Sequence, residues 1–293
     1  MSYRVLTDTS SNLPTPWLRE RGIDIVPFSY HYDGVAHQCL DTESFNGDEF
    51  YAKLKGGLKV TTSQVTPQLY MEHFEPVLAA GEDVLMICMS SGISGSCDSA
   101  RMAASELKEL YPLRHVEIID TLAASLGEGI VVMRAVELRD KGVELCRAVQ
   151  ELNALSKSVC QVFTVDDLMH LRRGGRLSNI SAVVGMVLQI KPILIGNEEG
   201  KIIAISKVRG RKRSIEILAD KYDKLAVKPE EQVVCIAQAG CREDAAYLAE
   251  LLHRNRPPKE ILTVEYEPVT GSHVGPGALA LFFVSGENVR SMR

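Results

Sequence analysis

The chain has 293 residues, of which 45% are hydrophobic and 24% charged, values typical of a globular protein with about two domains. Its net charge of −5 argues against a general nucleic-acid binder, whose domains carry a basic excess. Seven scattered cysteines without a Cys-x-x-Cys pair argue against a disulfide framework or a zinc site and indicate a reducing compartment. Because no apolar run approaches about 18 residues and the N-terminus lacks a secretory signal, we expect a cytoplasmic protein without a transmembrane segment.

The first half of the chain alternates between strand and helix patterns. Strands are predicted at 3–6, 23–26, 84–89 and 115–119, with helical patterns between and after them. Asp33-Gly34 predicts a hairpin turn. Thr66 and Pro67 mark the beginning of a helix that would bury Tyr70, Phe74, Val77 and Leu78. The alternation predicts a parallel sheet with helices on both faces.

The pattern changes near residue 156. A hairpin is predicted at 192–206, and helices are predicted at about 211–226 and 242–254. Further strands are predicted at 233–237, 261–266 and 278–284. These elements indicate an α+β layer with a mixed sheet. We therefore divide the chain into an α/β domain at 1–156 and a smaller α+β domain at 157–293, packed closely enough to share a cleft.

Two hydroxyl-rich segments predict an anion site. The strand at 84–89 ends in Ser90-Ser-Gly-Ile-Ser-Gly-Ser96 and a helix follows at once, which gathers free N–H groups, serine hydroxyls and a helix dipole. Earlier in the chain, Thr61-Thr-Ser-Gln64 offers similar hydroxyls and free N–H groups before the capped helix that begins at Pro67. The alternative for each is a plain helix cap without a ligand. Two such turns at the carboxyl ends of strands in one parallel sheet favour a ligand in the crevice.

Three further segments carry candidate residues. Gly174-Gly175 lies between arginines and precedes an apolar helix at 180–188, which is either buried or lines an apolar cavity. The basic cluster 207–213 is either a solvated helix start or a docking patch for an acidic partner or a phosphate. Binding to nucleic acid is the third alternative, because the chain as a whole is acidic. His273 lies in a glycine-rich segment between two strands, and we expect a loop there that gives the histidine access to a ligand.

A catalytic interpretation is weaker than a binding one. Gly92-Ile-Ser94-Gly-Ser96 approaches the nucleophile elbow of α/β-hydrolases, with Asp120 and His273 following in the hydrolase order, but Ser96 stands where the second glycine belongs. The sequence has no nucleotide-binding glycine loop and no metal-ligand spacing. We therefore assign no catalytic residue and no metal ligand, and keep a serine hydrolase using Ser94 as the alternative.

The ordered set of motifs resembles the DegV family. The matching segments run over essentially the whole chain: Thr7-Asp-Thr-Ser-Ser-Asn-Leu-Pro14, Thr62-Ser-Gln64, Ser90-Ser-Gly-Ile-Ser-Gly-Ser96, Ile119-Asp-Thr121, Phe163-Thr-Val-Asp-Asp-Leu168, Gly174-Gly-Arg-Leu177, Ile190-Lys-Pro-Ile-Leu194, Lys207-Val-Arg-Gly210 and His273-Val-Gly-Pro-Gly277. Ser96 stands where the family often has threonine, and Thr121 where serine is common; both keep the hydroxyl.

The resemblance implies a Rossmann-like parallel-sheet domain, a smaller α/β domain and a long-chain fatty acid buried between them. It implies a non-catalytic subunit without a cofactor, which presents the carboxylate to a separate fatty acid kinase that forms acyl phosphate. A regulator whose bound lipid is a signal is a further alternative. We also expect no nucleic-acid partner, and a transient contact with a membrane surface for lipid exchange.

The resemblance also implies roles for individual residues. Carried onto this sequence, the fatty-acid-binding residues are Thr62, Ser63, Ser94, Gly95, His273 and Arg173. The hydroxyls and the Gly95 N–H would bind the carboxylate, His273 would close the site from the second domain, and Arg173 would lie near the carboxylate. Arg176 and Arg209 would dock the kinase.

Overall fold

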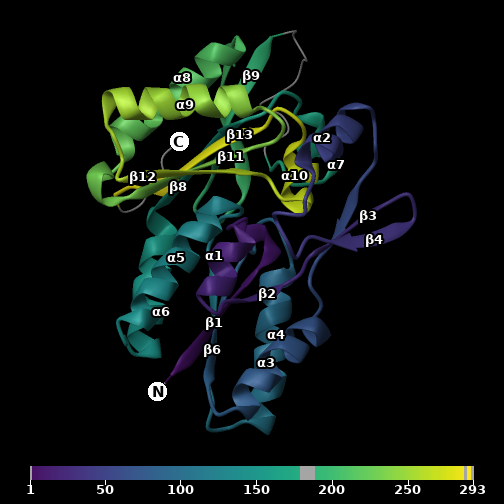
Figure 1. Cartoon of the computed structure of the whole chain (residues 1–293), viewed down its shortest axis with the longest axis vertical. Coiled ribbons are helices and arrows are strands. Elements are labelled where there is room, and N and C mark those ends of the chain that lie inside the picture. Colours follow the sequence, from purple (N-terminus) through teal and green to yellow (C-terminus); the bar gives the residue numbers. More distant parts are fainter. Residues whose placement is uncertain (1, 179–188, 287–288, 292–293) are drawn as a thin grey trace.

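The computed structural model describes residues 2–178, 189–286 and 289–291. Figure 1 shows two α/β units along the long axis, with the N-terminal unit below and the C-terminal unit above. The apolar helix expected at 180–188 lies outside the described residues. Within those residues, no helix is long and apolar enough to cross a membrane.

The N-terminal unit is built on a four-stranded parallel sheet, as predicted. Its strand order is β2-β1-β6-β7, and the strands are β1 (Tyr3–Asp8), β2 (Asp24–Val26), β6 (Asp83–Cys88) and β7 (Val116–Asp120). Every residue of β6 is buried, because this strand has neighbours on both sides and helices on both faces. The continuous apolar run of the sequence therefore marks a central strand.

Helices cover the two faces of this sheet. They are α1 (Thr15–Glu20), α3 (Pro67–Ala79), α4 (Ser96–Leu110), α5 (Leu126–Asp140) and α6 (Leu145–Ser158). The pair α3 and α4 lies on one side of the strands, and the pair α5 and α6 on the other (Figure 1). Thr66 accepts a hydrogen bond from the backbone N–H of Leu69, so the predicted cap of α3 is confirmed.

A small antiparallel sheet projects from the N-terminal unit. It has the order β4-β3-β5, with β3 (Ser29–Tyr32), β4 (Val35–Gln38) and β5 (Thr61–Ser63) beside α2 (Gly47–Lys55). Asp33 and Gly34 both have positive φ, which confirms the predicted hairpin turn. The structure corrects one expectation, because Thr62 pairs with Tyr30 in this separate sheet and does not follow a strand of the parallel sheet.

The C-terminal unit is built on a six-stranded mixed sheet. Its order is β10-β9-β8-β13-β11-β12, with β8 (Val159–Thr164), β9 (Ile190–Gly196), β10 (Ile202–Arg209), β11 (Val233–Gln238), β12 (Glu260–Glu265) and β13 (Leu279–Val284). Only β11 and β12 pair in parallel. The helices α8 (Arg211–Leu225) and α9 (Arg242–Asn255) pack on one face (Figure 1). The short helices α7 (Met169–Arg173) and α10 (Pro268–Val274) contact each other.

The two units are packed together without a linker. Helix α6 leads directly into β8, and the boundary expected at residue 156 falls in its last turn. Helix α5 contacts β1 and β6 on one side and β8, β11 and β13 on the other. A β-carbon at Gly127, in the first turn of α5, would lie 3.0 Å from the ring of Phe282, so α5 packs tightly against the sheet of the C-terminal unit at this point. Three short single-turn helices, η1 (Thr9–Ser11), η3 (Pro229–Glu231) and η4 (Val289–Ser291), complete the described elements.

Candidate functional site

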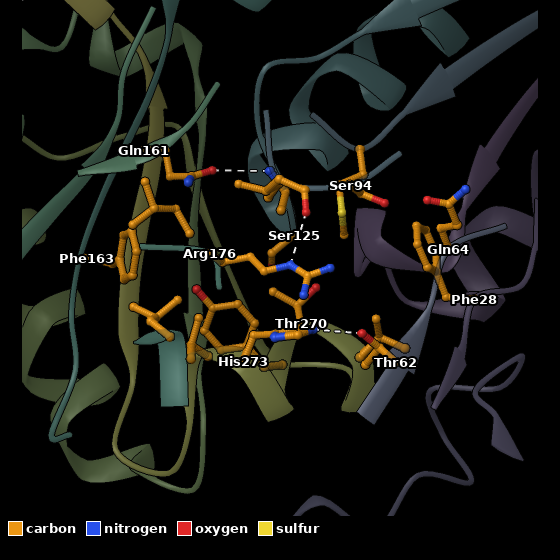
Figure 2. A pocket seen from close by; sticks show the side chains of 18 of the residues that line it. Phe28, Thr62, Gln64, Ser94, Ser125, Gln161, Phe163, Arg176, Thr270 and His273 are labelled. Carbon is orange, nitrogen blue, oxygen red and sulfur yellow. Dashed lines mark hydrogen bonds between the residues drawn. The ribbon is translucent and has the colours of Figure 1, made fainter. Parts of the chain in front are cut away.

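A narrow cavity lies where the two units meet. Its volume is about 50 Å³, and its walls come from β5, the segment after β6, the β7–α5 loop, β8, α10 and β13. Most of the lining is apolar, with the rings of Phe28, Phe163 and Phe282 among the larger groups. Polar side chains from both units converge on one part of it (Figure 2). A largely apolar cavity with a few convergent polar groups is the usual form of a small-molecule site.

The serine-rich turn after β6 forms one side of the polar part. Ser94 lines the cavity, and its Oγ lies 3.0 Å from Ser96 Oγ and accepts a hydrogen bond from the Ser96 N–H at 3.3 Å. Gly95 is the residue before α4, so the predicted helix N-terminus is present. A β-carbon at Gly95 would meet the side-chain amide of Gln64, which would have to move. The turn therefore brings the Ser94 hydroxyl to the cavity and begins a helix, whereas Gly95 is not among the residues that line the cavity. An anion site at this turn stays a prediction.

Thr62 and His273 join the two units across the cavity. Thr62 Oγ1 lies 2.8 Å from His273 Nε2 (Figure 2). The glycines around His273 led us to expect a loop, but this residue lies in the last turn of α10. This helix begins with Pro268, and the Glu267 carboxylate caps it by accepting the N–H groups of Val269 and Thr270. The cap fixes the direction of the helix and with it the position of the imidazole.

The imidazole of His273 is neutral at neutral pH. Burial, reinforced by the positive charge of Arg176, lowers the pKa of His273 to about 4. A neutral ring has one donor nitrogen and one acceptor nitrogen, so it can take part in a hydrogen-bond network with Thr62 and a ligand oxygen without contributing charge. Nδ1 faces Gly174, where any side chain would strike the ring.

Arg176 supplies the positive charge of the cavity. Its Nε donates to the carbonyl of Ile93 at 3.1 Å, and Nη1 donates to the carbonyl of Gly174. Among the described residues, no carboxylate lies within ion-pair distance of its guanidinium, and burial lowers the pKa of Arg176. Figure 2 shows the guanidinium between Ser94 and the His273–Thr62 pair. The cavity therefore holds a positioned cation for which the described part of the chain provides no counter-ion.

The two arginines beside the glycine pair differ from expectation. Arg173, expected near the ligand, is exposed and donates from Nε to the carbonyl of Met169 within α7. Arg176, expected at a docking surface, lines the cavity. Helix α7 ends at Arg173, and Gly175 has a φ of +71°, so the chain reverses and turns the next residue inward.

The remaining candidate residues are placed as follows. Ser63 lines the cavity and its Oγ lies 2.9 Å from His31 Nε2. Arg209 is exposed at the end of β10, which suits a docking role. Of the basic cluster that follows, Arg211 bonds Asp244 at 2.8 Å, so part of this cluster is paired within the protein.

The geometry does not assemble a hydrolase triad in the described residues. His273 bonds Thr62, whereas the Ser94 hydroxyl bonds Ser96. Asp120 accepts a hydrogen bond from Ser91 Oγ at 2.5 Å and from the Leu122 N–H at 3.1 Å. A nucleophile, its base and the orienting acid need to be hydrogen-bonded in series, so the arrangement favours binding over acyl transfer.

Sequence reasoning missed a buried acidic pair below the cavity. Asp8, at the end of β1, accepts the N–H of Met89, which lines the cavity. Glu128, in the first turn of α5, accepts hydrogen bonds from the hydroxyls of Thr7 and Ser10. Burial raises the pKa of both carboxyl groups. The signal available in the sequence was Glu128 itself, an isolated acid in an apolar helix.

Sequence reasoning also missed Gln161. This residue lies in β8, between apolar neighbours, and lines the cavity. Its Oε1 accepts the N–H of Ala124 at 3.2 Å (Figure 2). Ala124 and Ser125 belong to the β7–α5 loop and line the cavity as well. A polar residue interrupting the run Val159-Cys-Gln-Val-Phe163 was the only sequence signal.

Comparisons with known proteins agree with this architecture. The DegV family model matches residues 2–286. A DegV domain-containing protein of Clostridium perfringens is 36% identical over 283 residues, 96% of this chain and 97% of the relative. A solved structure described as fatty acid binding of a DegV family protein from Thermus thermophilus has a TM-score of 0.88 at 30% identity, covering 98% of this chain and 100% of that chain. DegV from Bacillus subtilis, described as a fatty acid binding protein, has a TM-score of 0.84 at 28% identity, covering 98% and 100%. The chain belongs to the DegV family.

Proposed function

We propose that this protein binds a long-chain fatty acid in the cavity between its two units. The observation that carries the proposal is an apolar cavity in which the guanidinium of Arg176, without an ion-pair partner among the described residues, lies beside the Thr62–His273 pair and Ser94. A carboxylate supplies the missing counter-ion, and the apolar walls accept the chain. The relatives described as fatty-acid-binding proteins support the same ligand class.

The energetics divide between the head group and the chain. Each hydrogen bond to a charged carboxylate contributes about 1.5–3 kcal/mol, and each buried methylene contributes about 0.8 kcal/mol. A chain of sixteen carbons thus gains on the order of 10 kcal/mol before entropy costs. At 10–15 Å³ for each water, a cavity of about 50 Å³ has room for roughly four waters. A long chain therefore enters only if lining side chains separate.

A finer proposal concerns what happens to the bound acid. We propose that the protein presents the carboxylate to a separate kinase, which transfers a phosphoryl group to it and forms acyl phosphate. The family resemblance and the exposed position of Arg209 support this role. The carboxylate would lie at the junction of the two units, where the hydroxyls of Thr62 and Ser94 hold it. In this scheme the protein has no catalytic activity of its own.

The experiment is to denature the purified protein and analyse the extract by mass spectrometry. We expect a co-purified long-chain fatty acid, and rebinding of a fluorescent fatty acid to the delipidated protein. Labelling of Ser94 by an ester probe, with turnover and without a bound lipid, would instead establish a hydrolase. Phosphorylation of the bound acid by an added fatty acid kinase and ATP tests the finer proposal separately.

A further inference from the structure

A second cavity lies in the C-terminal unit, on the far side of Gln161. Its volume is about 400 Å³, within the range of small-molecule sites. It is lined by β8, β9, α8 and η4, with apolar side chains such as Ile195 and Ile217. The charged groups in its wall are four cations and one carboxylate: Arg213, Lys221, Lys224, Arg290 and Asp220.

Arg290 gives this cavity a fixed positive charge. The residue is only 4% exposed, and it donates from Nε to the carbonyl of Ser156 at 3.0 Å and from Nη1 to that of Leu122 at 2.6 Å. Nη2 has no hydrogen-bond partner among the described residues, and no carboxylate there lies within ion-pair distance. Burial lowers the pKa of Arg290 to about 10, so the side chain is still charged at neutral pH. Among the described residues, the Asp120 carboxylate acts on this charge only from beyond ion-pair distance. Because a buried charge without a close counter-ion is costly, an anion in the cavity would offset part of that cost.

Helix α8 adds further charge along one face. Lys221 and Lys224 line the cavity about one and two helical turns after Ile217, and neither forms an ion pair with a described residue. Lys221 and the buried thiol of Cys160 both line this cavity. Arg213 and Asp220 pair with each other at 3.4 Å. The net positive charge of the cavity wall therefore comes from Arg290, Lys221 and Lys224.

Gln161 and Arg290 also connect the two cavities. Gln161 lines both, and because its Oε1 accepts the Ala124 N–H, its Nε2 is left as a donor without a partner in the described structure. Arg290 holds the carbonyl of Leu122 in the same β7–α5 loop. Leu122 and Ser125 have φ of 55° and 54°, a strained conformation for residues with side chains. Two residues that line the second cavity, Arg290 and Gln161, thus hydrogen-bond the β7–α5 loop, which lines the first cavity.

We propose that the second cavity binds an organic anion, a carboxylate or phosphate group attached to a short apolar portion, and that its occupancy changes the affinity of the first cavity. The anionic group pairs with Arg290, Lys221 and Lys224, while the apolar portion packs on Ile195 and Ile217. The coupling runs through the Arg290–Leu122 and Gln161–Ala124 hydrogen bonds. This site does not depend on the ligand proposed for the first cavity.

Titration calorimetry of the full-length protein tests the site with hexyl phosphate, hexanoate and inorganic phosphate as probes. Hexyl phosphate or hexanoate is expected to bind with a stoichiometry of one and with the same affinity in the parent and in Ser94→Ala protein, because a probe held in the first cavity would lose affinity with that hydroxyl. The stronger of the two identifies the anionic group. Inorganic phosphate should bind at least tenfold more weakly than hexyl phosphate. Equal affinity would refute the proposal that an apolar portion of the ligand contributes to binding.

Variants locate the site. Lys221→Gln combined with Lys224→Gln should weaken binding of the probe about tenfold. Ile217→Trp, which places a larger ring against the apolar portion of the probe without changing charge, should also weaken its binding. The matched control is Lys212→Gln, on the same helix but over the ring of Tyr247, and it should change affinity less than twofold. No saturable binding, or equal losses in the control, would overturn the proposal.

The coupling has its own measurement. Saturating hexyl phosphate should change the affinity of the parent protein for a fluorescent fatty acid at least threefold, and the fatty acid should change hexyl phosphate affinity by the same factor. An unchanged affinity in both directions would refute the coupling. Because probe binding is measured without fatty acid, failure of the second site and failure of the proposed lipid function give different results.

Discussion

Replacing Arg176 by glutamine is the most direct test of the first cavity. Its guanidinium is half-buried and is already held by the carbonyls of Ile93 and Gly174, so little order is lost when a carboxylate arrives. A charge pair at 4 Å contributes about 1 kcal/mol in water and about 4 kcal/mol at an effective dielectric constant of 20. A half-buried site lies between these limits, at roughly 2 kcal/mol, which corresponds to an increase in Kd of about 30-fold.

The assay is displacement of a fluorescent fatty acid from delipidated protein at fixed ionic strength. Arg173→Gln is the matched control, because this arginine lies three residues away, is exposed and does not line the cavity; we expect less than a twofold change. Unchanged lipid affinity in Arg176→Gln would refute the head-group role. If acyl-phosphate formation alone then fell, Arg176 would have the docking role expected from the sequence.

Three other predictions follow from the same geometry. Ser94→Ala and Thr62→Ala should each weaken fluorescent fatty-acid binding by about 1.5–3 kcal/mol without unfolding the protein in circular dichroism; unchanged affinity in both would place the carboxylate elsewhere. Nuclear magnetic resonance should show the pKa of His273 rising from about 4 when fatty acid binds, because a nearby anion favours the imidazolium; a static pKa would contradict contact with the head group. Burial raises the pKa of Glu267 from 4.5 to about 7, so the folded state binds the extra proton and loses stability as pH rises from 4.5 to 7. Denaturant unfolding should show that Glu267→Gln removes about 3 kcal/mol of this fall in the free energy of unfolding between pH 4.5 and 7. If the free energy of unfolding of the variant depended on pH as that of the parent does, Glu267 would not be the source.

Much of the fold could be predicted because its signals are local. The buried run in β6, the Asp33-Gly34 turn and the capped start of α3 each follow from a few adjacent residues. Thr62 shows where this fails. Strand β5 has only three residues, and its sequence is typical of the start of a helix. It is a strand because it pairs with β3, which lies about 30 residues earlier in the chain. Local patterns carry no information about such a partner.

The site was harder to predict than the fold. The glycines around His273 suggested a loop, whereas Glu267 and Pro268 form a valid helix start and were the better signal. The Gly174-Gly175 pair indicated a turn, but its direction depends on the positive φ of Gly175 and on the close approach of His273 to Gly174. That direction decides which of two nearby arginines faces the cavity. Sequence patterns give residue types and spacing, and the packing of the second unit selects among them.

The electrostatics of the first cavity explain why it favours an anion although the protein is acidic overall. Burial keeps His273 neutral, so Arg176 is the main source of charge at the polar part of the cavity. The carboxyls of Asp8 and Glu128 lie below, and burial raises the pKa of both. Their hydroxyl and N–H partners satisfy them internally. One cation in a low-dielectric, largely apolar cavity thus matches a ligand with one negative charge and an apolar body.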